Sequence, residues 1–130
     1  MTLVDTSLLI DSLAGPRRSG PLLRRAVAEG ERLVVSSMVL YEWLRGPRTA
    51  EELGDQELLF PAAAALAFEA EDSRLSAEIY RSLRRARGRE IDIAIAATAI
   101  RYDIPLWTLN PRDFEDVPRL RLFRPPGLAG

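Results

Sequence analysis

The sequence contains neither cysteine nor histidine. The lack of cysteine excludes disulfides, thiol nucleophiles and cysteine zinc sites. The lack of histidine excludes serine–histidine and cysteine–histidine catalytic pairs. Acid–base or metal chemistry must therefore use carboxylates, amides, hydroxyls or arginine, and oxygen-only ligands favour Mg²⁺ or Mn²⁺ over zinc.

Lysine is absent as well, so all 18 basic residues are arginine. This excludes a response-regulator-like phosphoacceptor domain, which needs a lysine beside its acids. The formal net charge is −1, and the chain therefore has no global basic field. Nucleic-acid binding would have to come from a local patch of arginines, whose planar guanidinium groups bind phosphate bidentately.

Long hydrophobic runs are missing too. No stretch of about 18 apolar residues could span a membrane, and Met1–Asp5 lacks the basic start and apolar core of a signal peptide. We therefore expect a cytoplasmic protein with no membrane association. The 130 residues suit one domain, which we place at 1–124, with a C-terminal tail at 125–130.

Short apolar segments alternate with helical patterns along the chain. Strands are predicted at Thr2–Val4, Arg32–Ser36, Ala65–Phe68, Leu106–Leu109 and Leu120–Phe123. Helices are predicted at about Leu22–Glu29, Met38–Arg45, Thr49–Phe60 with an interruption near Gly54, Asp72–Ala86 and Ile91–Tyr102. This alternation favours an α/β fold, a three-layer sandwich whose mainly parallel central sheet is covered on both faces.

Asp92 lies near the start of a segment that is otherwise apolar and small, Glu90–Ile100. An ionised carboxylate buried there without a partner is costly, which favours a cation, strong donors or a metal beside it. The alternative is a structural role, because a negative charge suits the first turn of a helix.

Other oxygen-bearing side chains follow predicted strands. Asp5 ends the first strand, Asn110 and Asp113 follow a later one, and Glu42 lies on the helix after the second. Ligands bind at the carboxyl ends of parallel strands, so these groups are expected to converge with Asp92. Packed carboxylates imply raised pKa values or divalent metal, and one or two ions would suit phosphoryl transfer.

Arginines cluster immediately before Asp92, among them Arg85 and Arg89. A solvated helix end explains them adequately. They could also hold an RNA backbone, together with Arg112.

Four segments together resemble the motifs of PIN-domain ribonucleases, most closely the VapC-type toxins of bacterial toxin–antitoxin pairs. They are Val4–Ser7, Ser37 with Glu42, Asp92–Ala99 and Thr108–Phe114, in that order across nearly the whole chain. The resemblance implies a PIN-like fold and a magnesium-dependent endoribonuclease, in which Mn²⁺ can substitute. It also implies a homodimer and a cognate antitoxin whose C-terminal segment occupies the active-site groove.

The resemblance also assigns roles to residues. Asp5, Glu42 and Asp92 match the metal-holding acids, and Thr6 matches a supporting hydroxyl. Asp113 is expected as the fourth catalytic residue, with Asn110 supporting, although either could fill that position. Water activated by the metal would attack the phosphodiester in line and leave a 5′-phosphate. Two alternatives remain open: a PIN nuclease acting on DNA, and a protein-binding module without catalysis.

Overall fold

A computed structural model of the chain describes residues 1–125. Its sheet consists of β1 (Thr2–Val4), β2 (Leu33–Val34) and β3 (Leu106–Trp107), in the order β2-β1-β3 and parallel throughout. The helices are α1 (Thr6–Leu13), α2 (Gly20–Ala28), α3 (Ser37–Arg45), α4 (Ala50–Leu59), α5 (Ala70–Ser82) and α6 (Glu90–Arg101), with 3₁₀ turns η1 (Ala62–Ala64) and η2 (Pro111–Asp113). The predicted α/β fold with a parallel sheet is confirmed.

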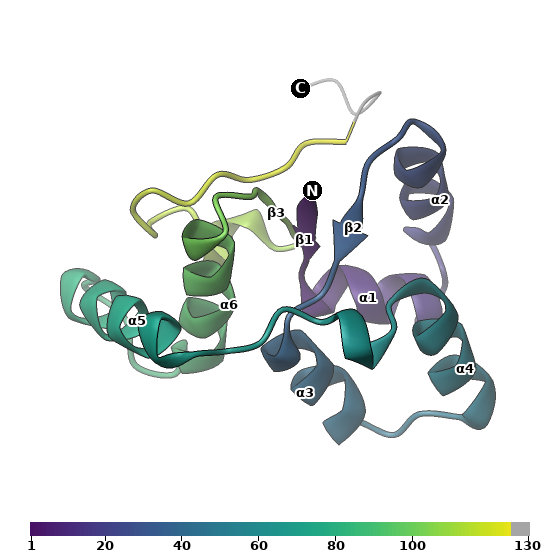
Figure 1. Cartoon of the computed structure of the whole chain (residues 1–130), viewed down its shortest axis with the longest axis horizontal. Coiled ribbons are helices and arrows are strands. Elements are labelled where there is room, and N and C mark those ends of the chain that lie inside the picture. Colours follow the sequence, from purple (N-terminus) through teal and green to yellow (C-terminus); the bar gives the residue numbers. More distant parts are fainter. Residues whose placement is uncertain (126–130) are drawn as a thin grey trace.

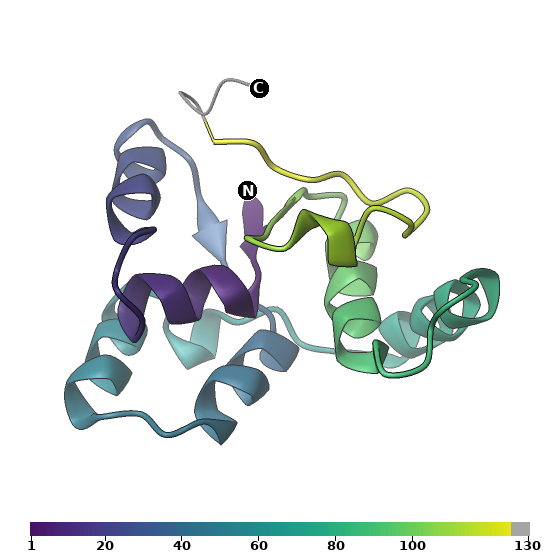
Figure 2. The same ribbon diagram turned by 180° about the vertical axis from the view of Figure 1, so that it is seen from behind.

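The helices lie on both sides of this small sheet. In Figures 1 and 2, α5 and α6 lie on one side of the strands, and α1, α2 and α4 on the other. Helix α3 contacts both α1 and α6. All three strands run toward α1 and α3, so their carboxyl ends meet at one edge of the sheet.

Helix α6 is the most buried helix of the fold. Its residues from Ile93 to Ala99 are buried without interruption, and five of these seven are alanine or threonine. Small side chains let the helix pack closely against its neighbours. Leu9, Leu13 and Trp43 belong to the same core, and Met38 packs against it. None of the helices within residues 1–125 is both long and apolar enough to cross a membrane.

Two predicted strands are wrong. In Ala65–Phe68 only Leu66 forms a bridge, to Ser36, because the Phe68 amide donates to the Ser37 hydroxyl instead of to a strand. Leu120–Phe123 forms one bridge, between Leu122 and Leu106. This segment follows Arg119, whose φ of 69° is that of a turn and not of a strand.

Two predicted helices differ in their extent. The predicted interruption near Gly54 is wrong, because α4 continues through it from a capping box formed by Thr49 and Glu52. Helix α5 ends at Ser82, before the predicted Ala86. The chain turns extended at Leu83 and passes Gly88 at φ +86°, which sets the start of α6 close to the sheet edge.

Candidate active site

Asp5 lies directly after β1, at the carboxyl edge of the sheet, and its side chain is 4% exposed. It occupies the N-cap position of α1, yet its carboxylate makes no capping hydrogen bond. Instead Oδ2 accepts hydrogen bonds from the Ser7 hydroxyl (2.9 Å) and the Thr108 hydroxyl (2.7 Å). Within residues 1–125 nothing donates to the other oxygen, Oδ1, which is left available to a ligand.

Both hydroxyls are themselves fixed by backbone amides. The Leu109 amide donates to Ser7 Oγ (3.1 Å), and the Asn110 amide donates to Thr108 Oγ1 (3.0 Å). Each hydroxyl therefore accepts a hydrogen bond from a backbone amide and donates its own proton to Asp5. Ser7 and Thr108 lie within the PIN-like motif segments, but the sequence alone assigned neither a role in the site. The sequence signal for these two residues was that each carries a hydroxyl just beyond the carboxyl end of a strand, Ser7 after β1 and Thr108 after β3. Asn110 enters this network through its backbone.

Glu42 reaches the same region from α3. Its Oε1 accepts a hydrogen bond from Thr6 Oγ1 (2.7 Å), and its Oε2 lies 3.4 Å from Arg45 Nη2. The side chain is 17% exposed. Thr6 begins α1, so this hydrogen bond joins the first helix after β1 to the helix after β2. Both carboxylate oxygens of Glu42 are thus already engaged.

Asp92 lies in the first turn of α6 and is half-buried. Burial raises the pKa of its carboxyl to about 6, and the negative charges of Asp5, Glu42 and Asp113 add to the increase. Arg89 acts in the opposite direction. The four acids predicted from the sequence therefore lie close enough for each of the others to oppose ionisation of Asp92.

Glu90 lies on the same helical turn as Asp92 and provides a comparison, because its contacts are those of an acid with a structural role. Its carboxylate accepts a hydrogen bond from the Gly88 amide (3.1 Å), and backbone hydrogen bonds lower its pKa. Asp92 has the opposite shift and accepts no side-chain hydrogen bond from residues 1–125. The helix N-terminus therefore accounts for Glu90 and not for Asp92.

The donor set fits a hard divalent cation in its chemistry, since every group is a carboxylate or hydroxyl oxygen. Within residues 1–125, however, no three acidic side chains already form a group that could hold a metal ion. Glu42 is held instead by Thr6 and Arg45. Asp5 Oδ1 and the Asp92 carboxylate are the oxygens suited to direct coordination, and Glu42 fits contact through water.

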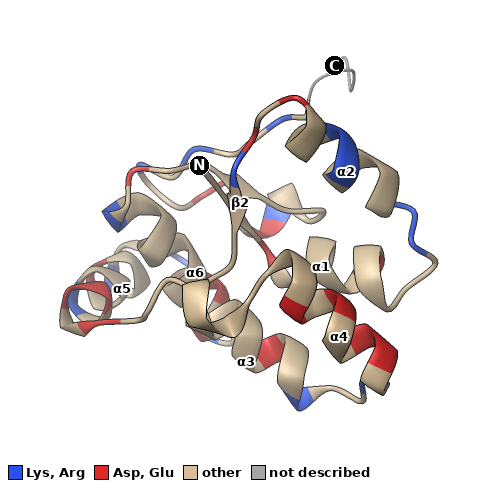
Figure 3. Cartoon of the chain, turned by 45° about the vertical axis from the view of Figure 1, so that its right-hand side comes forward, with Lys and Arg blue, Asp and Glu red and all other residues tan. Residues whose placement is uncertain are grey.

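The three arginines predicted to bind RNA occupy different environments. Arg85 and Arg112 are exposed near the start of α6 and on η2, whereas the guanidinium of Arg89 is bound to Asp116. Figure 3 shows basic and acidic residues interspersed on α5 and a run of acids on α4. Any contact to an RNA backbone would therefore be local to the acid cluster.

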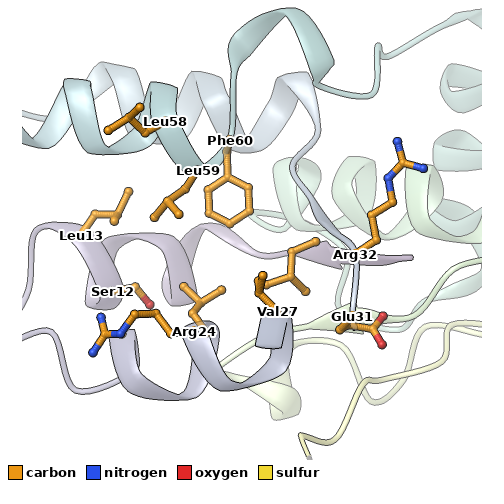
Figure 4. Close-up of a pocket in the computed structure, with 12 residues that line it drawn as sticks. Ser12, Leu13, Arg24, Val27, Glu31, Arg32, Leu58, Leu59 and Phe60 are labelled. Carbon is orange, nitrogen blue, oxygen red and sulfur yellow. The ribbon is translucent and has the colours of Figure 1, made fainter. Parts of the chain in front are cut away.

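A separate pocket of about 480 Å³ lies between α1, α2 and α4 (Figure 4). Its lining is largely apolar, including Leu13, Val27, Leu58 and Phe60. None of the acids of the candidate site lines it. Arg24, Arg32 and Glu31 also line it, so the pocket is an apolar hollow with a charged rim that lies apart from the acid cluster.

The substitution Thr108→Val tests the hydroxyl network. It removes one donor to Asp5 and leaves the Asn110 amide without its acceptor, so Asp5 is held less firmly. Loss of such a supporting contact lowers metal affinity or activity about 10-fold or more. Thr98→Val is the matched control, because the Thr98 hydroxyl donates only to the Ala94 carbonyl of its own helix. Equal Mn²⁺ affinities for the two variants would show that the network does not position Asp5.

Residues 2–120 match the family model described as PIN domain. The protein named Ribonuclease VapC19 from Mycobacterium tuberculosis is 34% identical over 123 residues, covering 93% of this chain and 98% of its own length. A protein named Ribonuclease VapC from Rickettsia bellii is 31% identical and covers 95% of this chain and 96% of its own length.

Two solved structures illustrate the likeness of fold. DNA-bound VapBC from Salmonella typhimurium matches with a TM-score of 0.77 and 22% identity, covering 94% of this chain and 96% of that one. FitAcB from Neisseria gonorrhoeae matches with a TM-score of 0.70 and 19% identity, covering 96% and 98%. At these identities the likeness shows the fold.

Proposed function

Because the chain belongs to the PIN-domain family, we propose that it is a divalent-metal-dependent endoribonuclease and the toxin of a VapBC-type toxin–antitoxin pair. The proposal combines the names of its relatives, Ribonuclease VapC19 and Ribonuclease VapC, with the acid cluster at the sheet edge. The single observation that carries it is the convergence of Asp5, Glu42 and Asp113 on the half-buried Asp92, where burial and these charges raise the pKa of Asp92 to about 6. Such a cluster is unfavourable unless a cation occupies it.

In this proposal each acid has a distinct task. Asp5 presents Oδ1, since its Oδ2 is held by Ser7 and Thr108. Asp92 presents its carboxylate from α6, and Glu42 acts through water or after releasing Arg45. Asp113 adds negative charge from η2. A bound divalent cation would supply the Lewis acid that lowers the pKa of a water and offsets charge on the phosphodiester.

The arginines would serve the substrate. Arg85 and Arg112 are exposed around the acid cluster and suit contact with RNA phosphates. Cleavage should then weaken as salt rises, because each phosphate contact releases condensed counterions. The oxygen-only donor set supports Mg²⁺ as the cation, and Mn²⁺ is expected to substitute.

The experiment that tests the function is cleavage of total bacterial RNA by the purified chain, with Mg²⁺ or with a chelator, followed by mapping of new 5′ ends. Single-stranded DNA serves as the comparison substrate. New 5′-phosphate ends that need Mg²⁺ and appear on RNA alone are the expected result. Equal cleavage of DNA would favour a DNA nuclease. Absence of cleavage, joined to absence of Mn²⁺ binding, would favour a protein-binding module.

Metal binding is expected to depend on pH in the range set by Asp92. Its folded-state pKa of about 6 lies above the ordinary 3.8, so protons compete with the cation below that value. The apparent Mn²⁺ affinity should fall about tenfold for each pH unit below about 6 and level off above it. Titration calorimetry at pH 5, 6, 7 and 8 measures this. An affinity unchanged from pH 5 to 7 would remove Asp92 from the metal site.

We further propose a homodimer and a cognate antitoxin as partners, acting in the cytoplasm where the RNA substrates are. The structural relatives with VapBC in their names support the antitoxin.

On α3, Tyr41 and Leu44 are each about half exposed, which gives a second copy of the chain an apolar surface to bind. Sedimentation of the chain alone and with the antitoxin, and cell fractionation, test these assignments. A monomer at micromolar concentration would exclude the homodimer.

A further inference from the structure

Arg89, the residue that precedes α6, makes four side-chain hydrogen bonds. Nη1 donates to the Arg85 carbonyl (2.8 Å) and to Asp116 Oδ2 (2.9 Å). Nη2 donates to the Asp113 carbonyl (2.8 Å) and to Asp116 Oδ1 (2.6 Å). The guanidinium and the Asp116 carboxylate thus form a bidentate pair, the geometry that only arginine provides.

These hydrogen bonds join three separate segments. Arg85 lies in the loop after α5, Asp113 ends η2, and Asp92 follows Arg89 by three residues in the first turn of α6. Among residues 1–125, no other hydrogen bond connects the first turn of α6 to η2. Arg89 is therefore the polar link between the two segments that carry Asp92 and Asp113.

Hydrophobic packing fixes the η2 region only in part. Phe114 and Val117 are 2% and 5% exposed and anchor the segment in the core. Asp113, immediately before Phe114, is exposed and has no side-chain hydrogen bond within residues 1–125. The hydrogen bonds from Arg89 are therefore the polar contacts, among residues 1–125, that could orient this turn relative to α6.

We propose that Arg89 is a positioning residue, which clamps η2 against the start of α6 so that Asp113 faces Asp92, and that it is not an RNA contact. The inference rests on the proposed function and replaces the role that the arginine cluster suggested for this residue. Asp116 is the anchor of the clamp. Its carboxylate holds the guanidinium, whose side chain is 21% exposed, away from solvent and from a passing RNA phosphate.

Three possible roles of Arg89 predict different changes in metal affinity. If Arg89 acted only as a nearby positive charge, its removal would strengthen cation binding to the acids. If Arg89 positions the acids, its removal separates them and weakens cation binding, by about tenfold for a supporting contact of this kind. If Arg89 were an RNA contact, its removal would not weaken cation binding, and it would instead raise KM for RNA and lessen the salt dependence of cleavage.

The experiment compares wild type with Arg89→Met, Arg89→Lys and Asp116→Asn, measuring Mn²⁺ affinity by titration calorimetry in the absence of RNA and then kcat and KM for RNA. We expect both Arg89 variants to bind Mn²⁺ about tenfold more weakly, with lower kcat and nearly unchanged KM. Arg89→Lys keeps the charge but loses the bidentate geometry, so it should resemble Arg89→Met. Asp116→Asn should weaken binding in the same direction and add nothing to Arg89→Met in the double variant.

Two control variants make the outcome specific. Asp103→Asn disturbs another arginine–aspartate pair, Asp103 with Arg121 at the far end of α6, and should leave Mn²⁺ affinity unchanged. Arg112→Gln removes an exposed arginine of η2 and should raise KM instead of lowering kcat. Thermal unfolding followed by circular dichroism identifies any variant that does not fold, and Asp116→Asn then carries the test.

Tighter or unchanged Mn²⁺ binding by a folded Arg89→Met would overturn the proposal. So would a raised KM with a reduced salt dependence, since that would make Arg89 an RNA contact. A wild-type chain that neither binds Mn²⁺ nor cleaves RNA would contradict the proposed function itself. If only the positioning role of Arg89 is refuted, in contrast, the wild-type chain still binds Mn²⁺ and cleaves RNA.

Discussion

Asp92→Asn is expected to abolish RNA cleavage while making the metal-free protein more stable. Loss of a group that organises charge in the transition state lowers kcat by about 10³-fold. The stability effect has a different cause. Burial and three neighbouring acids make the ionised Asp92 carboxylate unfavourable in the folded protein. Asparagine has a similar shape and lacks the charge.

The sign of the stability effect follows from the direction of the pKa shift. The folded-state pKa of Asp92, about 6, lies above its ordinary 3.8, so protonation stabilises the fold below pH 4 and this stabilisation is lost as pH rises through 6. Allowing for partial exposure, Asp92→Asn should raise the free energy of unfolding at pH 7 by about 1 kcal/mol. Urea unfolding at pH 7 with a chelator measures the difference, which should shrink toward pH 4.

Glu90→Gln is the matched control for Asp92→Asn, because both acids lie in the first turn of α6. Hydrogen bonds lower the pKa of Glu90, so its neutralisation should slightly destabilise the helix and leave cleavage intact. The two neighbouring substitutions are thus expected to change stability in opposite directions. If Asp92→Asn destabilised the metal-free protein, Asp92 would have a structural role at the helix N-terminus.

Arg101→Met is expected to destabilise the protein by about 3 kcal/mol, the cost of leaving a buried charge without its partner. The partner is Asp72, which is fully buried at the start of α5. Arg101 Nη2 donates to Asp72 Oδ2 (3.0 Å), and the same oxygen accepts the Glu69 amide (2.7 Å). The pair therefore joins the start of α5 to the end of α6. Thermal unfolding should show a Tm about 10 °C lower.

Two further variants show whether the stability loss comes from breaking the buried ion pair or from removing an arginine in general. Arg121→Met breaks an exposed pair with Asp103 and should cost under about 0.5 kcal/mol. Asp72→Asn added to Arg101→Met should recover part of the lost stability, since no buried charge then remains. If Arg101→Met and Arg121→Met unfolded at the same temperature, the ion pair would contribute nothing to the packing of α5 on α6.

The fold was largely predictable from the sequence because its signals are local. Alternating apolar and amphipathic segments indicate the β1–α1 and β2–α3 units, and the small apolar residues of α6 indicate a buried helix. The two strands wrongly predicted at Ala65–Phe68 and Leu120–Phe123 have strand-like composition. Their backbone groups are satisfied by a side chain or by a single bridge, which composition does not encode.

The site was predictable as a set of residue types and not as a geometry. Asp5, Glu42, Asp92 and Asp113 stood out as acids in apolar surroundings or after strands, and the structure brings the other three within electrostatic reach of Asp92. The contacts made by Thr108 and Asp116 were not predictable. They depend on how the β3–η2 region lies against α1 and α6, across more than 20 residues of chain in each case.

Asp5, Glu42 and Asp92 are proposed to hold a divalent cation together. The most direct measurement is the anomalous difference density of a crystal of the chain grown with Mn²⁺ near neutral pH. We expect a peak in contact with Asp5 Oδ1 and the Asp92 carboxylate, with Glu42 reaching it directly or through water, and no peak there in Asp92→Asn. A well-ordered site without Mn²⁺ density, or a peak that avoids Asp5 and Asp92, would contradict the proposal.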